Sequence, residues 1–232
     1  MSSSSTKLSG KRGAETILEK KPPEDFAIYG LEAAERSDDP CYLKVKYRDV
    51  DGSETTTQEF KECAGRKDGK GTTKSHRTVS LPDFMWAVGA RVCMNKGKIK
   101  GIQLIGEYEE CLLGAETVSV PAPCSRQFKQ NGSDQGIACP DPEDRRHVER
   151  ICGNTSLYRG AYFARPNCPG HKLTVPDEDW AKEVLCPAGQ VATGVQLSTA
   201  DGGGDRKLIN GLGLRCRTIE EFESRKIITR SN

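Results

Sequence analysis

The sequence shows no excess of charge of either sign. Its 232 residues include 35 Lys and Arg and 33 Asp and Glu, which leaves a formal net charge of +2. Domains dedicated to nucleic acid are usually strongly basic, and chains with a high net charge tend to stay disordered. The balance therefore argues against a nucleic-acid partner and against a highly charged disordered chain.

Long apolar runs are also missing. Hydrophobic residues make up 35% of the chain, and no run reaches the roughly 18 apolar residues that a membrane-spanning helix needs. The segment Met1–Lys7 carries no apolar core of a signal peptide. We therefore expect no membrane span, and a signal peptide is absent from the given sequence.

The patterns of common catalytic and metal sites do not occur. The three histidines, His76, His147 and His171, lack a second histidine at metal-ligand spacing, and there is no H-E-x-x-H or G-x-S-x-G motif. The basic stretch Gly65–Ser75 does not meet the spacing of a phosphate-binding loop. We expect no catalytic residue, no metal site and no cofactor, and hence no enzyme.

Cysteine is the residue that the sequence has in abundance. Neighbouring cysteines are never closer than thirteen positions, so the C-x-x-C pairs of zinc ribbons and thioredoxin-type sites are missing. Five disulfides are the economical interpretation, and disulfides persist in oxidising compartments. The ten cysteines are Cys41, Cys63, Cys93, Cys111, Cys124, Cys139, Cys152, Cys168, Cys186 and Cys216.

Two sequons agree with an extracellular location. Asn131 and Asn154 each begin an N-x-Ser/Thr acceptor for glycosylation. The absence of a signal peptide leaves three alternatives open: a signal that has been removed, unconventional secretion, or a cytosolic protein with free thiols. Cysteine spacing favours the extracellular alternatives.

Alternating residues predict β-structure from Cys41 onward. Tyr42–Tyr47 alternates apolar with polar residues, Asp51-Gly52 is a hairpin-turn signal, and Thr55–Phe60 is rich in β-formers. This pattern predicts a hairpin bracketed by Cys41 and Cys63.

A second hairpin is predicted near the end of the chain. Its strands are Gln190–Leu197 and Leu208–Cys216, joined by the glycine-rich turn 200–205, with Leu212 and Leu214 facing the core. Cys186 and Cys216 lie at the two ends of this hairpin and are predicted to form a disulfide. The same reasoning pairs Cys93 with Cys111, and the other six cysteines stay unassigned.

An internal repeat organises the middle of the chain. Pro82–Ala87 matches Pro176–Ala181 around the two tryptophans, Trp86 and Trp180, and a cysteine follows each. Gly101–Leu104 then matches Gly194–Leu197, at an offset close to 94. The repeat predicts two related all-β units of short antiparallel strands, a β-prism or β-sandwich, rather than a propeller or solenoid. The predicted divisions are a polar tail or arm 1–38, units 39–125 and 126–225, and a C-terminal tail 226–232.

The first 38 residues are polar and interrupted by Pro22-Pro23. Segments 14–20 and 27–36 have helical spacing, but the composition favours a flexible tail. One apolar cluster is expected to anchor the tail on its own chain or on a neighbouring copy. Its members are Phe26, Ile28, Tyr29, Leu31 and Ala34.

The stretch from Cys186 to Cys216 combines C-P-x-G, G-x-x-L, a Gly/Asp turn and N-G-[IL]-x-L-x-C. In this it resembles the vitelline-membrane outer-layer protein I family. The family's turn is matched by Gly203–Asp205, and its return strand is matched by Asn210-Gly211. The resemblance implies a secreted, disulfide-bonded β-prism of Greek-key sheets, with three repeats where the sequence pattern shows two. It also implies a role in egg coats or mucosal secretions, and oligosaccharide binding.

Three groups of side chains are candidates for binding or catalysis. Trp86 and Trp180 either anchor the core, which we favour, or stack on sugars. The carboxylates of Glu107, Glu109 and Glu110 would suit glycoside hydrolysis if they flanked a cleft, but a solvated edge strand is favoured. A basic loop is either solvated, which we favour, or contacts polyanions. Its residues are Lys61, Arg66, Lys67, Lys70, Lys74 and Arg77.

These observations predict a secreted, non-catalytic structural or coat protein that associates with copies of itself or with extracellular matrix. The alternative is a soluble lectin-like protein that binds carbohydrate. Glycans and acidic surfaces are the further partners expected.

Overall fold

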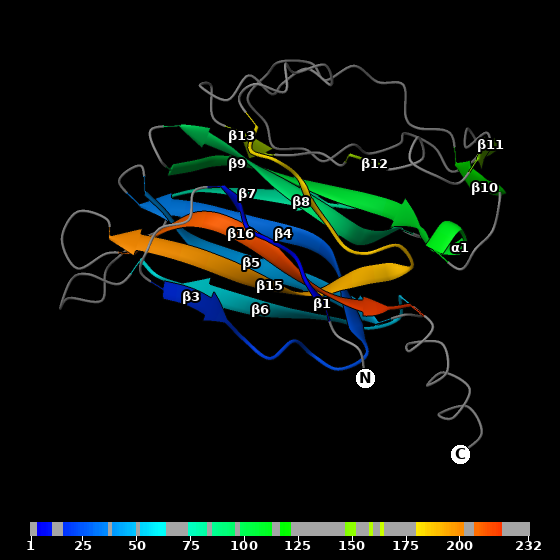
Figure 1. Ribbon diagram of the computed structural model, residues 1–232, viewed down its shortest axis with the longest axis horizontal. Coiled ribbons are helices and arrows are strands. Elements are labelled where there is room, and N and C mark those ends of the chain that lie inside the picture. Colours follow the sequence, from blue (N-terminus) through cyan, green and yellow to red (C-terminus); the bar gives the residue numbers. More distant parts are fainter. Residues whose placement is uncertain are drawn as a thin grey trace.

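The described residues of the computed structural model form an all-β protein with antiparallel strands throughout (Figure 1). The described residues include no helical segment with the length and hydropathy of a membrane span. The structure describes residues 4–10, 16–36, 39–49, 52–63, 74–82, 85–95, 98–112, 117–121, 147–151, 158–159, 163–164, 180–201 and 207–219.

The main strands form three sheets, which we call A, B and C. Sheet B is built from one continuous part of the chain. Its strand order is β6-β5-β4-β7, and alternation explains its two faces: Leu43, Val45 and Tyr47 are fully buried, while the lysines between them are half-buried. The predicted hairpin is confirmed as β5–β6, with Gly52 at a φ of 69° in its turn. The strands are β4 (Phe26–Arg36), β5 (Asp39–Asp49), β6 (Thr55–Lys61) and β7 (Lys74–Ser80).

Sheet C surrounds a second central hairpin, β8–β9. The strand β14 pairs with β8, and the short strands β12 and β13 both pair with the outer edge of β9. The strands are β8 (Met85–Asn95), β9 (Lys98–Tyr108), β12 (Tyr158–Arg159), β13 (Phe163–Ala164) and β14 (Val184–Leu185).

Sheet A joins the two ends of the described chain. Its central hairpin β15–β16 is the predicted C-terminal hairpin, and its outer strands come from the N-terminal residues. β1 and β2 pair with β16, and β3 pairs with β15. The strands are β1 (Ser4–Ser5), β2 (Ser9–Gly10), β3 (Thr16–Glu19), β15 (Gln190–Asp201) and β16 (Lys207–Thr218).

Two smaller elements lie outside the three sheets. The helix α1 (Glu109–Leu112) follows β9 directly. The strands β10 (Thr117–Pro121) and β11 (His147–Ile151) form a separate two-stranded sheet.

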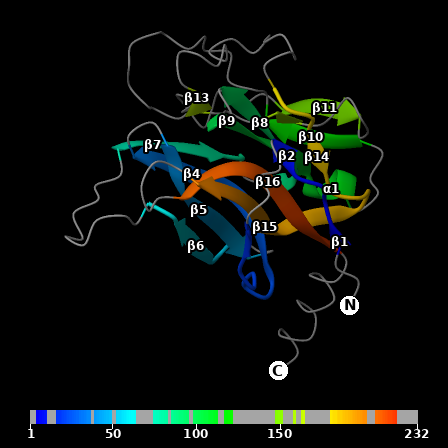
Figure 2. The same cartoon turned by 60° about the vertical axis from the view of Figure 1, so that its left-hand side comes forward.

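The three sheets enclose a main hydrophobic core to which all of them contribute, and together they form a β-prism (Figure 2). Each sheet contributes fully buried leucines, for example Leu31 in sheet B, Leu104 in sheet C and Leu212 in sheet A. In every sheet a third strand lies beside the second strand of the central hairpin and a fourth lies beside the first, which is the Greek-key order. Sheet A reaches this order only by using residues from the other end of the chain.

The three central hairpins repeat a local irregularity. In each, the register shifts by one residue just before a glycine of the first strand, and shifts again four residues beyond that glycine. A Cβ atom at the glycine would lie within 3.3 Å of the fourth strand or of the chain just after it. A larger side chain would therefore push that neighbouring strand away. The glycines are Gly30, Gly89 and Gly194.

The repeat expected from the tryptophans differs from this one. Trp86 lies inside β8, whereas Trp180 lies outside the named strands and makes a single bridge to Cys93. Gly101 is on the second strand of its hairpin and Gly194 on the first, so their predicted equivalence is wrong. The unit boundaries at 125 and 225 lie outside the described residues, and units 39–125 and 126–225 stay a prediction.

The expectation for the first 38 residues needs correction. Segments 16–19 and 26–36 are strands rather than helices or a flexible tail, and the predicted boundary at residue 38 separates β4 from β5, two strands that pair in one sheet. The segment has little apolar content, but Gly30 and the small alanines of β4 allow the strand to lie close between β5 and β7. The anchoring cluster is confirmed on its own chain, with Ile28 and Leu31 fully buried.

None of the described cysteines is free. The predicted Cys186–Cys216 disulfide is confirmed, and Cys41 pairs with Cys63. Because Cys186 directly follows β14, the Cys186–Cys216 bond links the edge of sheet C to sheet A. The Cys41–Cys63 bond connects β5 to the chain just after β6, both in sheet B.

The predicted Cys93–Cys111 bond is wrong, although both residues are disulfide-bonded. Cys93 pairs in register with Gly101 near the turn of its hairpin, while Cys111 follows Tyr108 at the opposite end. Seven strand residues separate these ends by about 24 Å, and a disulfide needs Cα atoms within about 7 Å.

Candidate functional site

A groove lies between the outer edges of sheets A and B. It has a volume of about 590 Å³ and follows β3 on one side and β6 on the other, two strands that lie side by side in Figure 1. The two edges are not hydrogen-bonded as a ladder, so side chains line the space between them. The lining residues are Leu18, Glu19, Lys20, Thr57, Glu59, Phe60, Lys61 and Glu62.

Side chains from both edges hold the groove together. Lys20 donates from Nζ to the Glu59 carbonyl oxygen at 2.5 Å, and Gln58 donates from Nε2 to the Lys21 carbonyl oxygen at 2.9 Å. The Lys20 ammonium also lies 5.2 Å from the centre of the Phe60 ring, which is buried. Phe60 is therefore an apolar floor beneath Lys20, held by packing and by a cation–π contact.

Glu59 is the most highly connected carboxylate of the groove. It accepts from the Tyr42 hydroxyl at 2.8 Å and forms ion pairs with Lys61 at 2.5 Å and Lys44 at 3.4 Å. Hydrogen bonds lower the pKa of Glu59 to about 2, with the largest effect from Lys61 and the next largest from Tyr42. Glu59 is therefore charged across the physiological pH range, and its orientation is fixed by three partners.

The opposite wall has a similar arrangement around Glu19. Its carboxylate pairs with Arg215 of β16 and accepts from Gln196 of β15. Both partners belong to the C-terminal hairpin, so Glu19 is tied to the centre of sheet A. The two walls thus present carboxylates that are already paired within the protein.

The charges of the groove nearly balance. Three carboxylates and two ammonium groups line it, and Arg215 and Lys44 stand behind two of the carboxylates. A site with donors and acceptors but little net charge attracts ions weakly, because its field largely cancels. Such a surface suits a neutral ligand that both donates and accepts hydrogen bonds.

The predicted polyanion site falls only partly within the described residues. Lys61 lines the groove, yet it is engaged by Glu59. Lys74 and Arg77 lie on β7, at the opposite edge of sheet B, which three strand spacings place about 14 Å from β6. Arg66, Lys67 and Lys70 lie outside the described residues, as do the sequons at Asn131 and Asn154, so polyanion binding and glycosylation stay predictions.

Both tryptophans are buried, as the favoured interpretation predicts. Trp86 is 3% exposed and Trp180 is 8% exposed. The Arg48 guanidinium lies 4.8 Å from the Trp86 ring centre, and Arg91 lies 5.0 Å from that of Trp180. Their rings therefore anchor the interior and present no stacking platform for a sugar.

The acidic residues before Cys111 do not form a solvated edge strand, because β9 lies between β8 and the strands β12 and β13. Glu107 is half-buried, and this burial raises its pKa. Glu109 accepts a hydrogen bond from the Trp86 indole at 3.3 Å. Within the described part of the chain, no cluster of three or more His, Cys, Asp or Glu side chains is arranged to hold a metal ion.

Comparison with known proteins gives structural similarity at low sequence identity. No family model matches the chain, and no curated protein sequence matches it. The agglutinin of Calystegia sepium is 9% identical, with a TM-score of 0.45 over 94% of this chain and 98% of that chain. AcmJRL, a mannose-binding jacalin-related lectin of Ananas comosus, is also 9% identical, with a TM-score of 0.40 over 93% of this chain and 98% of that chain.

A third similar structure is the V. cholerae biofilm matrix protein Bap1. It is 7% identical, with a TM-score of 0.36 over 93% of this chain and 24% of that chain. Each of these scores is below 0.5, so the β-prism assignment rests on the strand pairing described above. Membership of the vitelline-membrane outer-layer protein I family stays a prediction.

Proposed function

We propose that this chain is a secreted, non-catalytic protein that binds neutral oligosaccharides in the groove between β3 and β6. The observation that carries the proposal is the near-neutral lining, in which paired carboxylates and ammonium groups offer acceptors and donors. Sugars present many hydroxyl groups that each donate and accept, so they match a site of this composition.

Two further observations support this function. The side chains that hold Glu19 and Glu59 fix these carboxylates before a ligand arrives, which reduces the ordering cost of binding. The resemblance of residues 186–216 to the vitelline-membrane family implies oligosaccharide binding as well. Extracellular location is part of the proposal, and the disulfides Cys41–Cys63 and Cys186–Cys216 support it.

A glycan array followed by calorimetry tests the proposal. The wild-type chain should bind neutral oligosaccharides in preference to sulfated or sialylated ones, with little dependence on salt. The double variant Lys20→Ala/Glu62→Ala removes one donor and one acceptor from the groove and should weaken binding by about tenfold or more, which corresponds to about 1.4 kcal/mol.

The exposed residue Lys182, beside sheet C, supplies the matched control. Lys182→Ala should leave binding unchanged, because this substitution removes a positive charge that does not line the groove. Salt-sensitive binding to acidic glycans, or binding that the groove variant leaves intact, would overturn the proposal.

A structural or coat role is the second candidate, favoured by apolar side chains on sheet edges. Ile17 on β3 is 59% exposed and Leu185 on β14 is 43% exposed. Exposed apolar residues on edge strands promote pairing between copies. Light scattering over a range of concentrations tests this role: particles should grow for the wild-type chain and not for Ile17→Lys, and a constant particle size would argue against it.

A further inference from the structure

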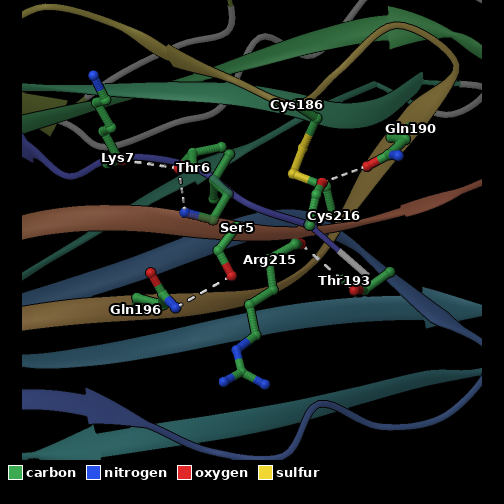
Figure 3. The surroundings of a disulfide bond; sticks show 11 residues. Ser5, Thr6, Lys7, Cys186, Gln190, Thr193, Gln196, Arg215 and Cys216 are labelled. Carbon is green, nitrogen blue, oxygen red and sulfur yellow. Dashed lines mark hydrogen bonds between the residues drawn. A yellow bond between two sulfur atoms is a disulfide. The ribbon is translucent and has the colours of Figure 1, made fainter. Parts of the chain in front are cut away.

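The outer strands of sheet A belong to a segment that we term the N-terminal arm, residues 4–19. The arm supplies the third and fourth Greek-key strands to a hairpin that lies almost 200 residues later in the chain. Figure 3 shows Ser5, Thr6 and Lys7 running beside β16, next to the Cys186–Cys216 disulfide.

Polar contacts dominate the attachment of the arm. Thr6 donates from its amide to the Leu214 carbonyl oxygen and accepts from the Leu214 amide at its hydroxyl, both at 2.9 Å. Ser4 donates to Gln190 at 2.6 Å, and Ser9 accepts from the Val92 amide at 3.3 Å. Among the described side chains of the arm, Ser9 alone is fully buried. Leu18 packs against the core but is only partly buried. Segments with few buried apolar contacts open at low free energy, so we expect the arm to be released more easily than the central hairpins.

The segment that joins the arm to β4 is stiff and strained. Residues 20–25 contain Pro22 and Pro23, which fix their own φ angles, and Asp25 adopts a φ of 64°. A positive φ is unfavourable for a residue with a side chain. An extended connection would relieve this conformation, and it would also carry the arm away from its own sheet.

Release of the arm exposes two strand edges at once. β15 loses its pairing with β3, and β16 loses its pairing with β1 and β2. Open edges accept other strands, and the arm of a second copy carries the side chains that fit these edges.

We propose that two copies of this chain exchange their N-terminal arms, so that residues 4–19 of each copy complete sheet A of the other. Exchange is reciprocal and closes as a twofold dimer. The groove then becomes a composite site, with Leu18, Glu19 and Lys20 from one copy facing β6 of the other. This inference goes beyond the carbohydrate proposal, because the arm contacts alone carry it.

Crosslinking of an isotope-mixed sample tests the exchange. Nitrogen-15-labelled and unlabelled full-length chains are unfolded with their disulfides intact, mixed, refolded at high concentration, and treated with a short lysine-reactive crosslinker. Lys20 and Lys61 both line the groove, so exchange predicts Lys20–Lys61 crosslinks between a labelled and an unlabelled chain. A dimer formed side by side would give this crosslink only within one chain, and that result would overturn the proposal, as would a sample that stays monomeric.

Hinge variants sharpen the test. Asp25→Gly removes the strain of the positive φ and should lower the dimer fraction several-fold. Glu24→Gly, a neighbouring change to glycine outside the strained position, should leave more dimer than Asp25→Gly does. Equal dimer fractions for the two variants would contradict strain as the driving cause. Sugar binding by a purely monomeric sample would leave the proposed function standing while the exchange failed.

Discussion

Sheets A and B have the same Greek-key order but are assembled from different parts of the chain. Sheet B comes from residues 26–80 in one continuous stretch, and the Cys41–Cys63 disulfide lies within it. Sheet A combines residues 4–19 with residues 190–218, and its disulfide connects it to the edge of sheet C. The spatial order of the strands is therefore the same in the two sheets, while the order of the strands along the chain differs between them.

The comparison also shows where stability is local. In sheet B, β4, β5 and β6 pair with neighbours in sequence and β7 returns to β4, so its loop closures are shorter than the closure that completes sheet A. The outer strands of sheet A are held by a long-range closure and by few buried apolar side chains. We therefore expect substitutions in the centres of both sheets to lower stability by similar amounts, and the edge strands of sheet A to open more easily than those of sheet B.

The largest effects should come from the centres. Leu43 in sheet B and Leu212 in sheet A occupy matching positions of their hairpins, and both are almost completely buried. Leu43→Ala and Leu212→Ala should each lower the free energy of unfolding by about 3–5 kcal/mol, because each leaves a cavity in one shared core. Urea unfolding should show a single transition for both variants. Separate transitions would mean that the sheets fold as independent units.

Removal of the disulfides should have the next largest effect. Cys41–Cys63 closes a separation of 22 residues and Cys186–Cys216 one of 30. The double variants to alanine should each lose about 3 kcal/mol, since loop-closure entropy depends weakly on length. Hydrogen exchange should distinguish the two variants: amides of β1–β3 should exchange faster only when Cys186–Cys216 is missing. Equal acceleration in both variants would contradict a specific link between this bond and the arm.

The repeated glycines provide a smaller and more local contrast. At Gly30 a Cβ would lie 2.9 Å from the Ser80 hydroxyl and 3.0 Å from the Val79 carbonyl oxygen, whereas at Gly194 it would meet Pro22 at 3.3 Å. Alanine in a strand gains about 0.5–1 kcal/mol over glycine through lower unfolded-state entropy. Thermal unfolding should therefore show a net loss for Gly30→Ala of about 1–2 kcal/mol, in the range of overpacked sites.

Gly194→Ala serves as the matched control in the same experiment. Its steric contact is milder, so the entropic gain should offset it to within about 0.5 kcal/mol. Equal losses at the two positions would show that the neighbouring chain approaches both glycines equally closely.

The smallest effect concerns pH. The folded-state pKa of Glu59 is lowered to about 2 from an ordinary value of 4.5. Its contribution to stability is therefore present above the ordinary pKa and is lost as the pH falls from about 4.5 towards about 2. The network is partly exposed to solvent, so the loss should be below about 1 kcal/mol. In Glu59→Gln this part of the acid dependence should be missing, while Glu54→Gln, at an exposed turn residue, should keep it.

The sequence predicts the hairpins well because their signals are local. Alternation in Tyr42–Tyr47, the Asp51-Gly52 turn and the leucines of the C-terminal hairpin all act over a few residues. The tryptophans and cysteines predict a repeat of two units, because Trp86 and Trp180 are followed by cysteines at similar spacing although they lie in unlike elements. A glycine followed by apolar, polar and apolar residues occurs in all three first strands, and this weaker signal marks the true repeat. The segments are Gly30–Ala33, Gly89–Val92 and Gly194–Leu197.

The arm and the groove were not predictable in the same way. The described residues of the arm include no fully buried apolar side chain, and the edges of a hairpin near residue 200 determine their strand structure. Composition carries no information on such pairing. Of the groove residues, the sequence singled out Lys61 alone, because the site arises from the approach of two sheet edges that no local motif records.

The pairing of Ser4 with Cys216 also sets an order in time. During synthesis, the strands of sheet B are all available once residue 80 has left the ribosome, whereas β1–β3 await the hairpin that ends at Thr218. At translation rates of roughly 5–20 residues per second, that wait lasts on the order of 10–40 s. A nascent chain therefore carries its first strands without their partners for most of its synthesis, and a finished chain nearby offers the earliest matching sheet.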